Sequence, residues 1–146
     1  MEILCTEGFK KAFNKLKKNK AYKFTVAQKV KESFFEEDLD KIISHRYCNP
    51  IYKLDEDRTL FKKRVQKRSE YRVLFLLVKS KEKFYLMEIF PKTGSKSQSD
   101  LGKFYTDKLK SLAQEIEAEK IYKVDLSENK EDIIFLERED KSTLSE

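Results

Sequence analysis

The sequence predicts an α+β domain, a small antiparallel sheet with an N-terminal helical hairpin and a C-terminal helix packed on it. Two observations favour this class. Apolar residues recur at helical spacing near both ends of the chain, whereas apolar runs separated by short polar connections fill its middle. The chain has 146 residues, of which 39% are hydrophobic, so it is long enough to bury one core.

The predicted domain covers most of the chain. We expect one domain over residues 1–137, with a core at 1–117 and a C-terminal hairpin extension at 118–137. Residues 138–146 are predicted to form an acidic, disordered tail, because they contain few residues that could join a core.

The N-terminal region changes from strand to helical periodicity. The stretch "MEILCT" predicts a short first strand before Gly8. Two stripes at helical spacing follow, separated by the basic "KKNK", and lysines occupy the face opposite the first stripe. The predicted helical hairpin therefore has one apolar side to bury. Its stripes are Phe9, Ala12, Phe13 and Leu16, then Val26, Ala27, Val30 and Phe34.

The middle of the chain predicts three strands, at residues 59–65, 71–78 and 84–90. Connections as short as "QKRSE" and "KSKEK" indicate antiparallel hairpins, and Pro91 ends the third strand. Residues 38–58 give an ambiguous pattern and are assigned mainly to loop. A third helical stripe spans residues 101–116, and "IYKVDL" with "DIIFL" predicts a closing hairpin.

The charge of the chain is gathered in segments. The net charge is +6, no acidic residue occurs in 8–31 or 61–69, and the sequence after Gln114 is rich in Glu and Asp.

No apolar stretch approaches the roughly 20 residues needed to cross a bilayer. The N-terminus lacks the pattern of a secretory signal. We therefore expect a cytoplasmic protein with no membrane partner.

The sequence offers no metal or cofactor motif. Cys5 and Cys48 lack the spacing of a zinc site, and His45 is the single histidine. Three glycines in the whole chain argue against a glycine-rich phosphate loop. We therefore predict that the protein uses no cofactor and no metal.

The densest positive charge lies against a predicted core strand, in "FKKRVQKRSEYRVLFLLV". If the first two middle strands pair with Val65 opposite Tyr71, Arg64 faces Arg72, and Lys62 points to the same face. Like charges directly opposite each other destabilise a hairpin, so this arrangement favours an anion bound between them.

The next strand adds further cations to this end of the sheet. It brings Lys92 beside Arg72, with Lys67 and Arg68 in the adjoining connection. Alternation along the same strand turns Glu88 away from this face.

The stretches "LFKKRV", "EYRVLFLLV" and "YLMEIFPK", in this order of elements, resemble the RelE/ParE toxin superfamily, especially its RelE and HigB-like messenger-RNA interferases. The resemblance is clearest over residues 59–101 and absent after about residue 117. It implies a RelE-like fold and the toxin of a type II toxin–antitoxin pair. Such a toxin acts as an endoribonuclease on mRNA at the ribosome, without a metal, by attack of the ribose 2′-hydroxyl on phosphorus. The implied partners are a cognate antitoxin, the ribosome and mRNA.

The resemblance also implies roles for individual residues. Lys62 takes the proton of the 2′-hydroxyl, since neighbouring cations lower the pKa of a lysine. Arginines stabilise the charge of the transition state. The family often places Tyr, His or Glu in the site, whereas position 90 here is Phe. The catalytic residues implied are Lys62, Arg64, Arg72 and Lys92, and the residues assigned to RNA binding are Lys63, Lys67, Arg68 and Tyr71.

Two alternative functions remain open from the sequence. One is a ParE-like gyrase inhibitor without nuclease activity, on the same fold. The other is a non-catalytic RNA-binding module, which should expose aromatic side chains for base stacking. The converging cations favour the nuclease. Most phenylalanines fall on stripes expected in the core, which argues against the RNA-binding module.

Overall fold

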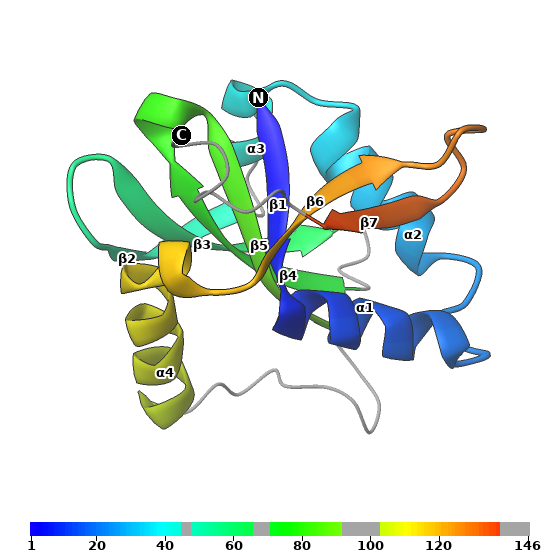
Figure 1. Cartoon of the computed structure of the whole chain (residues 1–146), viewed down its shortest axis with the longest axis horizontal. Helices are drawn as coiled ribbons and strands as arrows, with labels where there is room; N and C mark the ends of the chain where they lie inside the picture. Colours follow the sequence, from blue (N-terminus) through cyan, green and yellow to red (C-terminus); the bar gives the residue numbers. More distant parts are fainter. Residues whose placement is uncertain (45–47, 66–70, 92–102, 138–146) are drawn as a thin grey trace.

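The computed structural model of the chain describes residues 1–44, 48–65, 71–91 and 103–137, with the backbone alone described at 103–106 (Figure 1). Seven described strands form one sheet in the order β2-β3-β4-β5-β1-β6-β7. The strands are β1 (Glu2–Thr6), β2 (Cys48–Lys53), β3 (Arg58–Val65), β4 (Tyr71–Val78), β5 (Lys83–Pro91), β6 (Ile121–Leu126) and β7 (Ile133–Glu137). The α-helices are α1 (Glu7–Lys18), α2 (Val26–Val30), α3 (Leu39–Ser44) and α4 (Lys103–Gln114).

The predicted small antiparallel sheet with a helical hairpin is wrong. β1 runs parallel to β5 and antiparallel to β6, so the first strand of the chain lies inside a mixed sheet. In place of one second helix there are α2, a π-helical turn over Lys31–Phe35 and then α3. Local periodicity does not reveal which distant strands pair, and this is why the sheet was underestimated.

Two further features enlarge the sheet. β2 lies in the segment that was assigned mainly to loop, and its register with β3 shifts between Pro50 and Tyr52. Proline is tolerated there because β2 is an edge strand. The predicted closing hairpin forms β6 and β7, and it continues the same sheet because Tyr122 pairs with Cys5 of β1.

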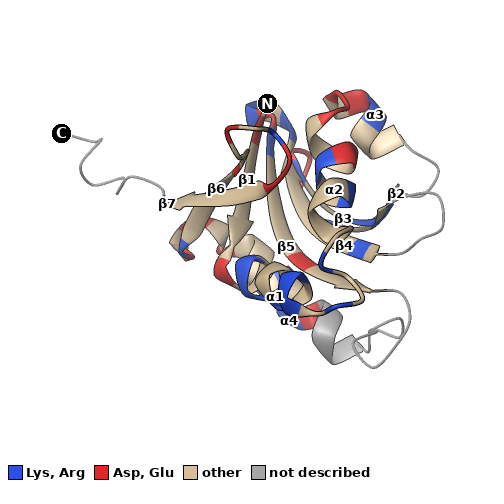
Figure 2. Ribbon diagram, turned by 90° about the vertical axis from the view of Figure 1, so that its right-hand side faces the viewer, with Lys and Arg blue, Asp and Glu red and all other residues tan. Residues whose placement is uncertain are grey.

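The sheet is covered on both faces. Buried residues of α1, α2 and α3 pack with Val73 and Phe75 of β4 on one face, whereas α4 packs with Leu74 and Leu76 on the other. Every residue of β4 is buried, as expected for the centre of such a sandwich. Figure 2 shows α2 and α3 apart from α4. No helix in the described part of the chain has both the length and the apolar character needed to span a bilayer.

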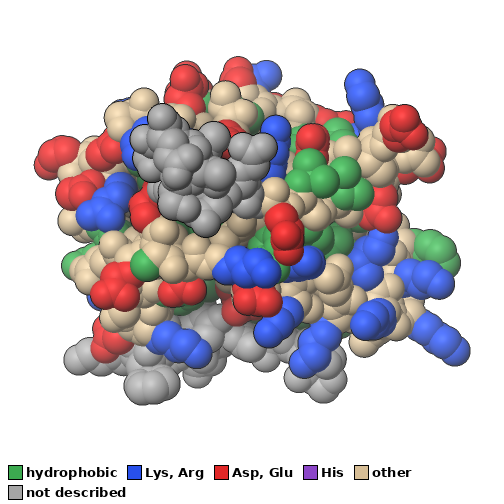
Figure 3. All heavy atoms as spheres, in the orientation of Figure 1, with side chains coloured by type: hydrophobic (Ala, Val, Ile, Leu, Met, Phe, Trp, Pro, Cys, Tyr) green, Lys and Arg blue, Asp and Glu red, His purple; other side chains and the backbone are tan. Residues whose placement is uncertain are grey.

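Helix α1 brings a row of cations to the surface. Its first turn is capped, since the Phe9 N–H donates to Thr6 Oγ1 at 3.2 Å. Its apolar stripe of Phe9, Phe13 and Leu16 is buried, so the lysines between these positions are left outside. Lysine side chains gather on the surface over α1 and the connection to α2 (Figure 3).

Candidate functional site

The predicted pairing of β3 with β4 is confirmed. Arg64 lies opposite Arg72, and Val65 lies opposite Tyr71. Because paired residues share a face and alternate residues return to it, Lys62 lies on the same face as both arginines. This is the face that α4 covers farther along the sheet.

Strand β5 extends this surface. Arg72 pairs with Phe90, and Leu74 pairs with Glu88, after a register shift between Leu74 and Phe75. Without that shift Glu88 would fall on the opposite face, so the prediction that it points away from the site is wrong.

The face therefore carries two rows of side chains that run across β3, β4 and β5. Within each row, neighbouring residues come from adjacent strands, which lie about 4.8 Å apart. The first row is Arg64, Arg72 and Phe90, and the second is Lys62, Leu74 and Glu88.

The Arg72 side chain is the unusual group of this surface. It is only 7% exposed, yet within the described part of the chain its Nε and Nη1 atoms are buried and have no hydrogen-bond partner. Burial, and secondarily the charge of Arg64, lower the pKa of Arg72. A buried polar group without a partner is rare and destabilising. An anion beside the guanidinium would satisfy both nitrogens.

Lys62 lies within the electrostatic reach of both arginines. Partial burial is the main cause that lowers the pKa of Lys62, and the charges of Arg72 and Arg64 lower it further. The lower pKa predicted from the crowding of cations is therefore confirmed in direction, with burial as the larger contribution.

Two residues assigned to RNA binding lie elsewhere. Lys63 is 4% exposed on the opposite face, and its Nζ donates to the Ile42 carbonyl at 2.9 Å. Tyr71 is fully buried, with its hydroxyl 2.6 Å from Thr25 Oγ1. Neither side chain reaches the surface that carries Arg64. Three other predicted residues, Lys67, Arg68 and Lys92, lie outside the described residues.

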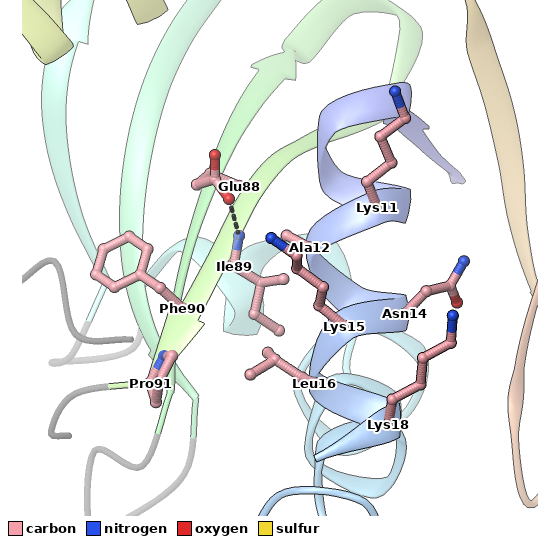
Figure 4. A pocket seen from close by; sticks show the side chains of 10 residues that line it. All are labelled: Lys11, Ala12, Asn14, Lys15, Leu16, Lys18, Glu88, Ile89, Phe90 and Pro91. Atoms are coloured by element: carbon pink, nitrogen blue, oxygen red, sulfur yellow. Dashed lines mark hydrogen bonds between the residues drawn. The ribbon is translucent and has the colours of Figure 1, made fainter. Parts of the chain in front are cut away.

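A cleft of about 600 Å³ lies between α1 and the end of β5, and one of its lining residues, Phe90, pairs with Arg72 (Figure 4). Within β5, only Lys83–Leu86 pair with β1, so α1, rather than another described strand, borders the rest of β5 on that side. One wall carries cations and an amide, and the other is mainly apolar apart from Glu88, whose carboxylate accepts the Ile89 N–H at 3.3 Å. The lining residues are Lys11, Ala12, Asn14, Lys15, Leu16, Lys18, Glu88, Ile89, Phe90 and Pro91.

This cleft was not predictable from the sequence. The lysine row of α1 was visible in the sequence, but its neighbour β5 lies about seventy residues away and joins it only in the fold.

The remaining reactive side chains do not form a second site. Within the described ranges, no three His, Cys, Asp or Glu side chains gather as potential ligands of a metal ion. Burial raises the pKa of Cys5 to about 12 and that of Cys48 to about 11, so both are thiols at neutral pH.

Comparison with known proteins adds no assignment. No family model matches the sequence, and neither curated proteins nor solved structures give a significant match.

Proposed function

We propose that the protein is an endoribonuclease that binds an RNA phosphodiester against Arg64 and Arg72 and cleaves it without a metal. One observation carries the proposal: among the described residues, the buried Arg72 guanidinium has no hydrogen-bond partner for Nε and Nη1, and Arg72 lies in direct register with Arg64. An arginine fork matches two oxygens of a phosphate, which makes a phosphodiester a better occupant than a halide or other point anion.

The proposed reaction is a transesterification. Neutral Lys62 removes the proton of a ribose 2′-hydroxyl, whose oxygen bonds to the adjacent phosphorus. The bond from phosphorus to the 5′-oxygen breaks, and that oxygen takes a proton from water. The protonated Lys62 then gives its proton to the hydroxide that remains, which restores the neutral amine and water. The products are a 2′,3′-cyclic phosphate and a 5′-hydroxyl end. Arg64 and Arg72 stabilise the negative charge of the phosphorane between these states.

The biological setting of the proposal comes from the sequence resemblance. Residues 59–101 resemble the RelE and HigB-like messenger-RNA interferases, so we place the protein in the cytoplasm as a toxin that cleaves mRNA at the ribosome and inhibits translation. A cognate antitoxin would neutralise it by covering Lys62, Arg64 and Arg72. Co-expression with the adjacent reading frame should then protect Lys62 from lysine-labelling reagents.

The nuclease proposal is tested with matched oligonucleotides. The purified protein, with and without ribosomes, is incubated in EDTA with an mRNA fragment and with the same sequence in 2′-deoxy form. Cleavage of the RNA alone, leaving cyclic phosphate ends, is the expected result. Primer extension on messages from cells that briefly express the chain should map discrete cleavage sites.

Other outcomes separate the alternative functions. Intact messages together with induced DNA breaks would indicate a gyrase inhibitor. Tight binding of both oligonucleotides without cleavage, on and off the ribosome, would indicate an RNA-binding module and contradict the nuclease proposal.

A further inference from the structure

The cleft between α1 and the end of β5 lies one strand away from Arg72 and has both cationic and apolar walls. Phe90 lines the cleft and is also the direct neighbour of Arg72 in the sheet. An RNA strand bound at Arg72 would therefore reach the cleft after crossing a single residue of β5.

The two walls of the cleft suit different parts of one ligand. Lys11 and Lys15 are exposed and lie one helical turn apart on α1, about 5–6 Å between their Cβ atoms, so they can meet successive charges. Figure 4 shows the Lys15 side chain extended toward β5. Facing them, the β5 wall is mainly apolar and shallow: Ile89 points toward α1 (Figure 4), and Ile89 and Pro91 are both almost fully buried. Regularly spaced anions joined to flat, partly apolar groups fit this arrangement, and single-stranded nucleic acid has both properties.

The acidic group in the cleft limits where the anions can lie. Glu88 sits at the β5 wall, where its carboxylate accepts the Ile89 N–H. A phosphate beside it would be repelled, whereas one against the α1 wall would not. Bases or riboses therefore belong on the β5 side and phosphates on the α1 side.

We infer that this cleft is a substrate subsite that holds the nucleotides flanking the scissile phosphate, with their backbone on Lys11 and Lys15. The inference rests on the proposed function, since it assumes that RNA binds at Arg72. It adds that the substrate is a single strand several nucleotides long, because a dinucleotide held at the arginines would leave the cleft empty.

The test compares charge removal in the cleft with matched removal elsewhere. The probes are a 2′-deoxy hexanucleotide and the corresponding dinucleotide, which bind without being cleaved. The test variant is Lys11→Gln with Lys15→Gln. The control is Lys79→Gln with Lys81→Gln, which removes two exposed lysines from the β4–β5 turn at the opposite end of the sheet. Fluorescence anisotropy across a salt series gives the affinity and the salt slope for each.

The expected result is specific to the longer probe. The test variant should lose on the order of tenfold affinity for the hexanucleotide at low salt, and its log–log salt slope should fall by about 1.4, or about 0.7 for each lost phosphate contact. Dinucleotide binding should not change, and the control variant should match wild type with both probes.

Two results would overturn the inference. One is an equal effect of the test and control variants, which would indicate general attraction to a basic protein. The other is displacement of the hexanucleotide by a polyglutamate peptide of equal charge as readily as by unlabelled hexanucleotide, which would assign the cleft to an acidic protein segment. Because both probes resist cleavage, these outcomes are independent of whether the matching RNA is cut.

Discussion

Replacement of Arg72 by alanine tests whether this residue serves function at the expense of stability. Truncation removes two buried methylene groups, which destabilises the fold by about 1.6 kcal/mol at about 0.8 kcal/mol each. It also removes two buried guanidinium nitrogens that lack partners among the described residues, worth about 1–3 kcal/mol each, and a like-charge pair with Arg64 worth up to about 1 kcal/mol. The free energy of unfolding should therefore stay the same or rise by a few kcal/mol.

Arg72→Met sharpens this comparison, because it keeps most of the buried stem and removes only the charge. Replacing buried charge by an apolar side chain of similar volume often stabilises a protein by about 1–4 kcal/mol. The melting temperature of this variant should rise by about 2–4 °C for each kcal/mol.

Catalysis should respond in the opposite direction. Loss of a preorganised cation from the transition state costs roughly 3–4 kcal/mol, by analogy with oxyanion-hole deletions, which lowers the cleavage rate by about two to three orders of magnitude. Arg72→Lys should recover only part of the rate, since a point charge cannot hold two phosphate oxygens in a planar fork.

The assay measures thermal unfolding and single-turnover RNA cleavage on the same preparations. The reasoning is refuted if Arg72→Ala and Arg72→Met both melt earlier and lose activity only in proportion to the unfolded fraction. That pattern would identify Arg72 as a structural arginine.

Two further predictions concern the opposite faces of β3, and a third concerns an exposed phenylalanine before α2. The pKa of Lys62 is lowered in the fold, so the unfolded chain binds more protons than the folded chain just below the usual pKa of lysine. The free energy of unfolding should therefore rise with pH in that window. A denaturation series across pH should show a flatter rise for Lys62→Met. Lys63→Ala should destabilise the fold by about 1–3 kcal/mol in urea denaturation, because the Ile42 carbonyl loses its buried donor. Cleavage per folded molecule should stay unchanged. A large selective loss of cleavage would instead show that Lys63 belongs to the site. Phe24 is 82% exposed, so Phe24→Ser should leave the melting temperature within about 2 °C of wild type, whereas Phe13→Ser in the core should lower it by far more; equal losses would place Phe24 in a packed environment.

The grouping of Lys62, Arg64 and Arg72 was predictable because it depends on local rules. A five-residue connection between two apolar runs specifies an antiparallel hairpin, and alternation then places Lys62, Arg64 and Arg72 on one face. The same alternation separates Lys63 from them, but its buried amine could not be anticipated, since the accepting carbonyl of Ile42 lies in α3, which was not predicted as a separate helix.

The position of Glu88 shows where alternation fails. An irregularity in the β4–β5 register inserts one residue and moves Glu88 to the face of Arg72. Bulges depend on how a strand accommodates its neighbours across the sheet, so the sequence of β5 alone does not reveal this one.

Local sequence was enough to predict the strands of the central hairpins, the amphipathic character of α1 and the pairing of Arg64 with Arg72, because each depends on residues close together in the chain. Three features emerge only from tertiary packing: the mixed sheet, the burial that leaves Arg72 Nε and Nη1 without a partner among the described residues, and the cleft between α1 and β5. Each of these requires segments far apart in sequence to pack together, and the free energy of that packing depends on the whole core rather than on any local pattern.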